Sequence, residues 1–187
     1  MIDFPAGRFY NHGITNRLIG RDPMRYRKLL PWVLALLAVS GCGHKKEPEN
    51  RFYQLDETVS TAFFEYQVEH VAVTRNYHGL RANPGHRIVV LELTIENTEY
   101  YDLSMGRYDF RLQWGEGEED IAYPQIWYYV EQFPNHYEIP ADEEVTGQLV
   151  FQVPETEEDL FLGYLEVFEN DSQGDAYFTQ FHVETVS

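Results

Sequence analysis

The chain has 187 residues, a formal net charge of −17 and a single cysteine, and 43% of its residues are hydrophobic. A chain of this length is expected to form one domain with a sizeable core, and its apolar content excludes wholesale disorder. The acidic balance argues against nucleic acid as a partner, because binding to phosphates needs clustered Lys and Arg. One cysteine excludes an intrachain disulfide and a zinc site built from cysteines.

The first part of the chain has the pattern of an export signal. Three basic residues precede an apolar run over residues 29–39, and small residues then lead to Cys42. The run is too short to span a bilayer, which takes about 20 residues in a helix. A basic region, a short apolar region and a small-residue cleavage site indicate a signal peptide, predicted over residues 24–41. Residues 1–23 lack this pattern, so we expect translation to begin at Met24.

The segment Leu-Ala-Val-Ser-Gly-Cys that ends at Cys42 resembles the lipobox of bacterial lipoproteins. In that family the cysteine thiol carries diacylglycerol, and cleavage leaves this cysteine as the first residue. The resemblance implies that Cys42 anchors the protein at the extracytoplasmic face of the cell membrane; the alternative is an incidental cysteine after an apolar stretch. Cleavage would remove six of the 14 Lys and Arg but only two of the 31 Asp and Glu, so the charge would become −21.

A polar segment follows the cysteine. Residues 43–57 contain Pro48 and show no apolar period. Such a composition is typical of a flexible spacer. We therefore expect the lipidated cysteine and a flexible tether over residues 42–57, and a folded domain over residues 58–187.

The predicted domain consists of β-strands. In residues 89–97 apolar and polar side chains alternate strictly, which is typical of a strand with one buried face. In residues 62–74 the apolar positions change parity near Glu69 and His70, which predicts a bulge or break there. Short strands separated by turn-rich stretches indicate an all-β fold, an antiparallel sandwich or barrel. The predicted strands cover residues 62–74, 89–97, 108–114, 121–129, 145–153, 160–168 and 176–183.

Three of these stretches carry a family resemblance. Residues 85–99 (GHRIVVLELTIENTE), 108–113 (YDFRLQ) and 144–155 (EVTGQLVFQVPE) resemble, in this order, the telokin-like domain of unknown function found in bacterial lipoproteins. The resemblance covers roughly residues 58–183 and implies an immunoglobulin-like sandwich of about seven strands, with no catalytic residues. One departure is visible, since the family's Pro-Gly-Glu turn is replaced by Pro-Ala-Asp-Glu at residues 140–143.

Metal-binding patterns are weak. The histidines form no His-x-His, His-x-x-x-His or His-Glu-x-x-His pair, and His78 and His86 alone could approach each other across a loop. Acidic residues cluster in four predicted turns, at residues 115–120, 141–144, 156–159 and 169–175. Carboxylates from several loops can bind calcium, although an acidic turn is more often solvated surface. No metal ligand and no cofactor is assigned.

Catalytic patterns are also weak. Serines are few, there is no Gly-x-Ser-x-Gly motif, and the only thiol is the predicted lipid attachment site. Glycoside hydrolysis needs only two suitably placed carboxylates, but no spacing singles out a pair. We therefore expect the protein not to be an enzyme.

Residues 121–137 are rich in aromatic side chains. Trp127, Tyr128, Tyr129 and Phe133 lie close together there, and aromatic residues often anchor interfaces. We take these four as the candidate binding residues for a protein or glycan at the cell surface; the alternative is a core Trp flanked by edge tyrosines. The sequence thus predicts a membrane-anchored, non-catalytic binding module. The alternative function is an accessory protein that handles calcium or carbohydrate, and an enzyme ranks third.

Overall fold

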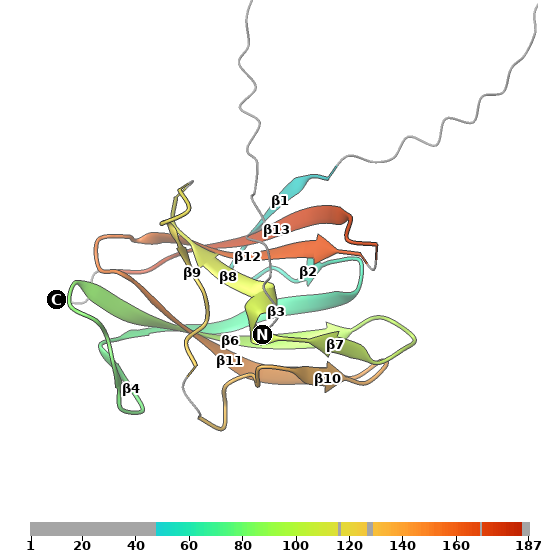
Figure 1. Cartoon of the computed structure of the whole chain (residues 1–187), viewed down its shortest axis with the longest axis horizontal. Helices are drawn as coiled ribbons and strands as arrows, with labels where there is room; N and C mark the ends of the chain where they lie inside the picture. The colour runs from blue at the N-terminus through green and yellow to red at the C-terminus, as the bar shows by residue number, and fades with distance from the viewer. Residues whose placement is uncertain (1–47, 116, 127–128, 169, 185–187) are drawn as a thin grey trace, which may run out of the picture. The chain divides into compact units, whose positions relative to one another are not determined.

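The structure is a computed structural model that describes residues 48–115, 117–126, 129–168 and 170–184 (Figure 1). The predicted signal peptide, Cys42 and the first part of the tether lie outside the described residues. Within the described ranges, no helix has the length and apolar character needed to cross a bilayer.

Two β-sheets make up the two layers of the domain (Figure 1). The first sheet has the order β1-β13-β12-β8-β9, and the second has the order β11-β6-β3-β2. Two short pairs, β10-β7 and β4-β5, complete the structure, and every pair except the parallel β1-β13 is antiparallel. The predicted all-β sandwich is thereby confirmed. The elements are β1 (Asn50–Gln54), β2 (Val59–Ser60), β3 (Phe64–Thr74), β4 (Asn76–Tyr77), β5 (Leu80–Arg81), β6 (His86–Asn97), β7 (Leu103–Met105), η1 (Arg107–Asp109), β8 (Phe110–Gln113), β9 (Ile121–Ala122), β10 (Tyr137–Ile139), β11 (Glu144–Pro154), β12 (Asp159–Val167) and β13 (Gln173–His182).

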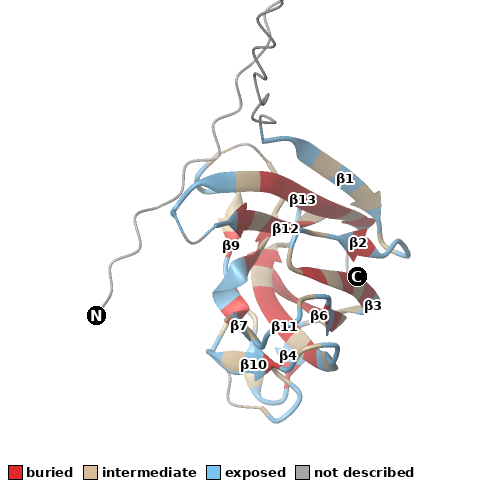
Figure 2. Ribbon diagram, turned by 90° about the vertical axis from the view of Figure 1, so that its right-hand side faces the viewer, coloured by how far each residue is buried: buried red, intermediate tan, exposed pale blue. Residues whose placement is uncertain are grey.

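The core lies between the two sheets. On β6, Leu91, Leu93 and Ile95 are fully buried and belong to the same cluster as Leu112 of β8 and Leu162 of β12. Figure 2 shows the buried residues along the strands of both sheets. Burial of each such side chain stabilises the fold by about 1.5–3 kcal/mol. The period-2 pattern of the sequence therefore determines which face of each sheet becomes the core.

A bulge in β3 keeps the apolar side chains before and after it on the same face of the sheet. The pairing of β3 with β6 shifts register between Val68 and His70, as the sequence predicts. Before the bulge Tyr66 and Val68 are buried in the core, and after it Val71 packs against the core. The side chain of His70 therefore lies on the outer face of the sheet.

The predicted flexible tether extends too far, because part of it forms a strand. Residues 50–54 form β1, which pairs with β13, so the folded domain includes part of the segment expected to be flexible. Tyr53 stacks on Tyr177 with a centroid distance of 6.3 Å, and Phe52 stacks on Phe178 at 5.3 Å. A strand of five residues with a polar surrounding is too short to give a clear apolar period.

The prediction of a strand over residues 121–129 is wrong for the described residues after Ala122, which are 123–126 and 129. Among the described residues of this range, Ile121–Ala122 alone form a strand, β9, because Pro124 has no N–H to continue a ladder. The chain then passes to the edge of the other sheet, where the backbone N–H of Gln125 donates to the carbonyl oxygen of Val150 at 2.6 Å. The aromatic segment thus connects the two layers instead of extending one of them.

The altered family turn keeps a tight geometry. The N–H of Glu143 donates to the carbonyl oxygen of Pro140 at 3.1 Å, and Asp142 has a φ of 58°. Asp tolerates this left-handed conformation better than most residues because its short side chain can bond locally. The missing glycine is therefore compatible with the fold.

Candidate functional site

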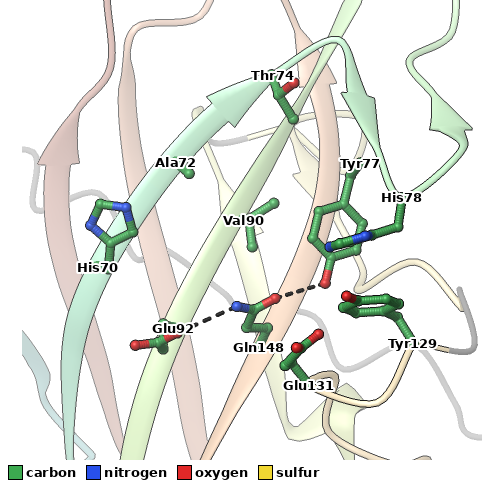
Figure 3. Close-up of a pocket in the computed structure, with 10 residues that line it drawn as sticks. All are labelled: His70, Ala72, Thr74, Tyr77, His78, Val90, Glu92, Tyr129, Glu131 and Gln148. Carbon is green, nitrogen blue, oxygen red and sulfur yellow. Dashed lines mark hydrogen bonds between the residues drawn. The ribbon is translucent and has the colours of Figure 1, made fainter.

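A groove of about 410 Å³ lies on the face of the four-stranded sheet that is opposite to the core (Figure 3). This volume falls in the range of small-molecule sites, roughly 300–1,000 Å³. Strands β3, β6 and β11 form its floor, and the β4-β5 hairpin and the segment after residue 128 form its wall. Its lining residues are His70, Ala72, Thr74, Tyr77, His78, Val90, Glu92, Tyr129, Glu131 and Gln148.

The floor of the groove is partly apolar. Ala72 and Val90 are its apolar lining residues on the sheet. Val90 also belongs to a second buried cluster with Ile88, Val150 and Tyr77, on the face away from the main core. The β4-β5 hairpin covers this cluster. Tyr77 of β4 packs into it and is only 8% exposed. The hairpin is therefore held against the sheet by packing and has a fixed position beside the groove.

The turn of this hairpin places His78. Both central residues have positive φ, 46° at His78 and 91° at Gly79, as a two-residue hairpin turn requires. The Oδ1 atom of Asn76 accepts a hydrogen bond from the N–H of Gly79 at 3.1 Å. The imidazole of His78 then stacks on the ring of Tyr129, with centroids 3.5 Å apart and planes at 17° (Figure 3). The stack joins the hairpin to the aromatic segment.

A chain of hydrogen bonds runs across the groove. The hydroxyl of Tyr77 donates to Oε1 of Gln148 at 2.7 Å, and Nε2 of Gln148 donates to Oε2 of Glu92 at 3.3 Å (Figure 3). Burial, together with the nearby carboxylate of Glu131, raises the pKa of Tyr77 to about 12. Tyr77 is therefore a neutral donor at physiological pH, and its hydrogen is committed to Gln148.

The two described residues of the predicted aromatic set, Tyr129 and Phe133, do not share one surface. Tyr129 lines the groove, but Phe133 is 3% exposed and packs in the main core, so Phe133 is not part of an exposed patch. The backbone N–H of Phe133 donates to the carbonyl oxygen of Gln148 on β11 at 3.1 Å. This bond holds Phe133 at the edge of the sheet, with its ring in the core. Trp127 and Tyr128 lie outside the described residues.

The metal hypotheses gain no candidate site. Among the described residues, no group of three or more His, Cys, Asp or Glu side chains is arranged to hold a metal ion. His78 stacks on Tyr129, and the ring of His86 lies 3.1 Å from the carbonyl oxygen of Pro84. In the acidic turn before β9, the carboxylate of Asp120 accepts the N–H of Gly117 at 2.9 Å and stabilises the turn itself.

Most groove residues are not candidates from the sequence alone. Tyr77, Glu92, Glu131 and Gln148 come from three strands and a loop, and no motif connects them. One signal was present: residues 88–91 are apolar on both faces, which is typical of a strand covered on both sides. That run indicates an outer cluster but does not identify what packs on it.

The fold is shared with solved bacterial proteins. A candidate lipoprotein (ycdA) of Bacillus subtilis matches 67% of this chain at 18% identity with a TM-score of 0.55, and the match spans 38% of the Bacillus protein. A protein of unknown function from Listeria monocytogenes matches 70% of this chain and 84% of its own at 12% identity, with a TM-score of 0.50. At these identities the similarity shows the fold alone.

Sequence comparison gives the family. No curated protein matches the chain. The sequence model of the domain of unknown function DUF4352 matches residues 53–174, which run from the end of β1 to the start of β13. The chain therefore belongs to the DUF4352 family.

Proposed function

We propose that the chain is a lipoprotein anchored through Cys42 at the extracytoplasmic face of the membrane, and that its sandwich is an immunoglobulin-like, non-catalytic binding module. The lipobox-like sequence before Cys42 supports the anchor. Each buried CH₂ of an attached acyl chain adds about 0.8 kcal/mol, and two chains suffice for stable anchoring.

The groove on the outer face is the observation that carries the binding function. It combines an apolar floor with a few convergent polar groups, as small-ligand sites do. Its position leaves the sandwich core intact, so that a ligand can occupy it without a change of fold. This geometry favours a binding role over the calcium-handling alternative, for which the described residues offer no ligand set.

Cell fractionation tests the anchor. We expect the wild-type protein in the membrane fraction with a diacylglyceryl modification on Cys42, detected by mass spectrometry. The Cys42→Ser variant should appear in the soluble exported fraction. A variant that stays in the membrane fraction would contradict lipid anchoring.

Thermal shift tests the binding role. The full chain in detergent is probed with spermidine and, separately, with a neutral chitooligosaccharide. We expect one of the two probes to raise the melting temperatures of the wild type and of His182→Ala, a control variant on the other sheet. The same probe should not raise the melting temperatures of His70→Ala and Tyr129→Ala. Equal shifts in all four proteins, or none, would argue against a binding groove.

A further inference from the structure

The groove offers mainly hydrogen-bond acceptors. The hydroxyl hydrogen of Tyr77 and one amide hydrogen of Gln148 are already used within the chain of bonds that ends at Glu92. The carboxylate oxygens of Glu92 and Glu131 are acceptors, and the oxygen of Tyr77 has acceptor capacity left. The imidazoles of His70 and His78 also line the groove and can each donate an N–H. Acceptor oxygens therefore outnumber the donors of the groove, which favours a ligand rich in N–H donors.

The charge of the groove points to the same chemistry. Two carboxylates line it, and none of its ten described lining residues is Lys or Arg. The last lysine of the chain is Lys46, and Arg87 and Arg107 are buried at 1% and 5% exposure. Two exposed arginines, Arg75 and Arg81, flank the β4-β5 hairpin outside the groove lining, and Arg75 pairs with Glu155 at 3.1 Å. The negative electrostatic potential of this acidic domain attracts cations and raises their local concentration near the groove.

The aromatic rings in the groove do not suit a neutral sugar. His78 covers one face of the Tyr129 ring at 3.5 Å, and the ring of Tyr77 is buried in the outer cluster. Sugar binding typically uses an open aromatic face together with both donors and acceptors. The described part of the groove provides acceptors in excess and no broad stacking platform from these two rings.

We propose that the groove binds a small organic cation with ammonium or guanidinium groups, whose N–H hydrogens are accepted by Glu92 and Glu131. This inference rests on the proposed binding function of the same groove. The volume of about 410 Å³ is in the range of a free small molecule. The apolar floor of Ala72 and Val90 can contact the aliphatic part of such a cation.

Isothermal titration calorimetry of the full chain in detergent tests the inference with spermidine as the probe. The wild type is compared with Glu131→Gln and Glu92→Gln, which remove one groove charge each and keep the shape. Glu138→Gln is the matched control, because Glu138 is an exposed carboxylate on β10 outside the groove. A chitooligosaccharide and a lysine-rich peptide are titrated in parallel, and thermal melting verifies that each variant is folded.

We expect saturable binding of one spermidine, weakened about tenfold or more by each groove variant and unchanged by Glu138→Gln. Binding should also weaken as salt is added. Equal loss in all three variants would overturn the site. Groove-dependent binding of the oligosaccharide or of the peptide, without spermidine, would overturn the cation inference and keep the binding function. Absence of binding by every probe would overturn both.

Discussion

The ring of Phe133 lies directly against the backbone of Gly147. A Cβ atom added to Gly147 would come within 2.8 Å of Cδ1 and of Cε1 of that ring. The contact holds the end of the aromatic segment under β11, while Tyr129 and Glu131, a few residues earlier, line the outer groove. One glycine therefore fixes the position of the groove wall.

Substitution of this glycine should destabilise the domain. We expect Gly147→Ala to lower the free energy of unfolding by about 1–3 kcal/mol, because the buried ring has little room to move. Gly163→Ala is the matched control, since its Cβ would lie 3.3 Å from Phe178 and the cost should be smaller. Urea denaturation measures both. If Phe133→Leu does not relieve the effect of Gly147→Ala, the proposed contact is not its cause.

Two residues of the aromatic segment should behave differently. Phe133→Ala is expected to cost about 3–5 kcal/mol of stability, as for other buried aromatic residues. Tyr129→Ala should cost far less, because Tyr129 is only half-buried, but it should impair binding in the groove. Unfolding and binding measurements on the same two variants separate the roles. Similar losses of stability would place Tyr129 in the core as well.

The first strand should depend on one ion pair. Nη2 of Arg51 lies 2.7 Å from Oδ2 of Asp175, and Oδ1 of Asp175 accepts the N–H of Glu49 at 3.0 Å. Asp175→Ala should therefore cost about 1–3 kcal/mol and increase hydrogen exchange across β1. Glu155→Gln disrupts the more exposed pair with Arg75 and should cost less than about 1 kcal/mol. Unchanged exchange in β1 after Asp175→Ala would show that packing alone holds the strand.

Alkaline pH should destabilise the fold. Burial is the main cause that raises the pKa of Tyr77, to about 12, and it also raises the pKa values of Tyr66, Tyr137 and Tyr164. Because the folded state holds these protons more tightly than the unfolded chain, their contribution is complete below about pH 10. The Tyr77 contribution is lost as the pH rises through about 12.

Urea unfolding across the alkaline range, with tyrosinate absorbance recorded in parallel, measures this effect. The free energy of unfolding should fall as the pH rises above about 10. Tyr77→Phe should make the decrease shallower. A free energy that stays constant through this range would contradict the burial of the tyrosine hydroxyls.

The sequence predicts the sandwich because short strands separated by turns recur along the chain, and because apolar and polar side chains alternate from Leu91 to Glu96. The β3 bulge is predictable for the same reason, since only an extra residue near Glu69 keeps Tyr66 and Val71 on one face. β1 is missed because its stability comes from stacking on distant Tyr177 and Phe178. The groove is missed because Tyr77, Glu92 and Gln148 meet only through strand pairing.

Hydrogen exchange of the full chain with and without bound spermidine locates the ligand and therefore tests whether the groove is the binding site. We expect protection in peptides that contain His78, Glu92 and Glu131, and no change in β12 and β13 of the other sheet. Protection on β12 and β13, or an absence of protection around the groove when spermidine is bound, would contradict the claim that the outer face of the β11-β6-β3 sheet is the binding site.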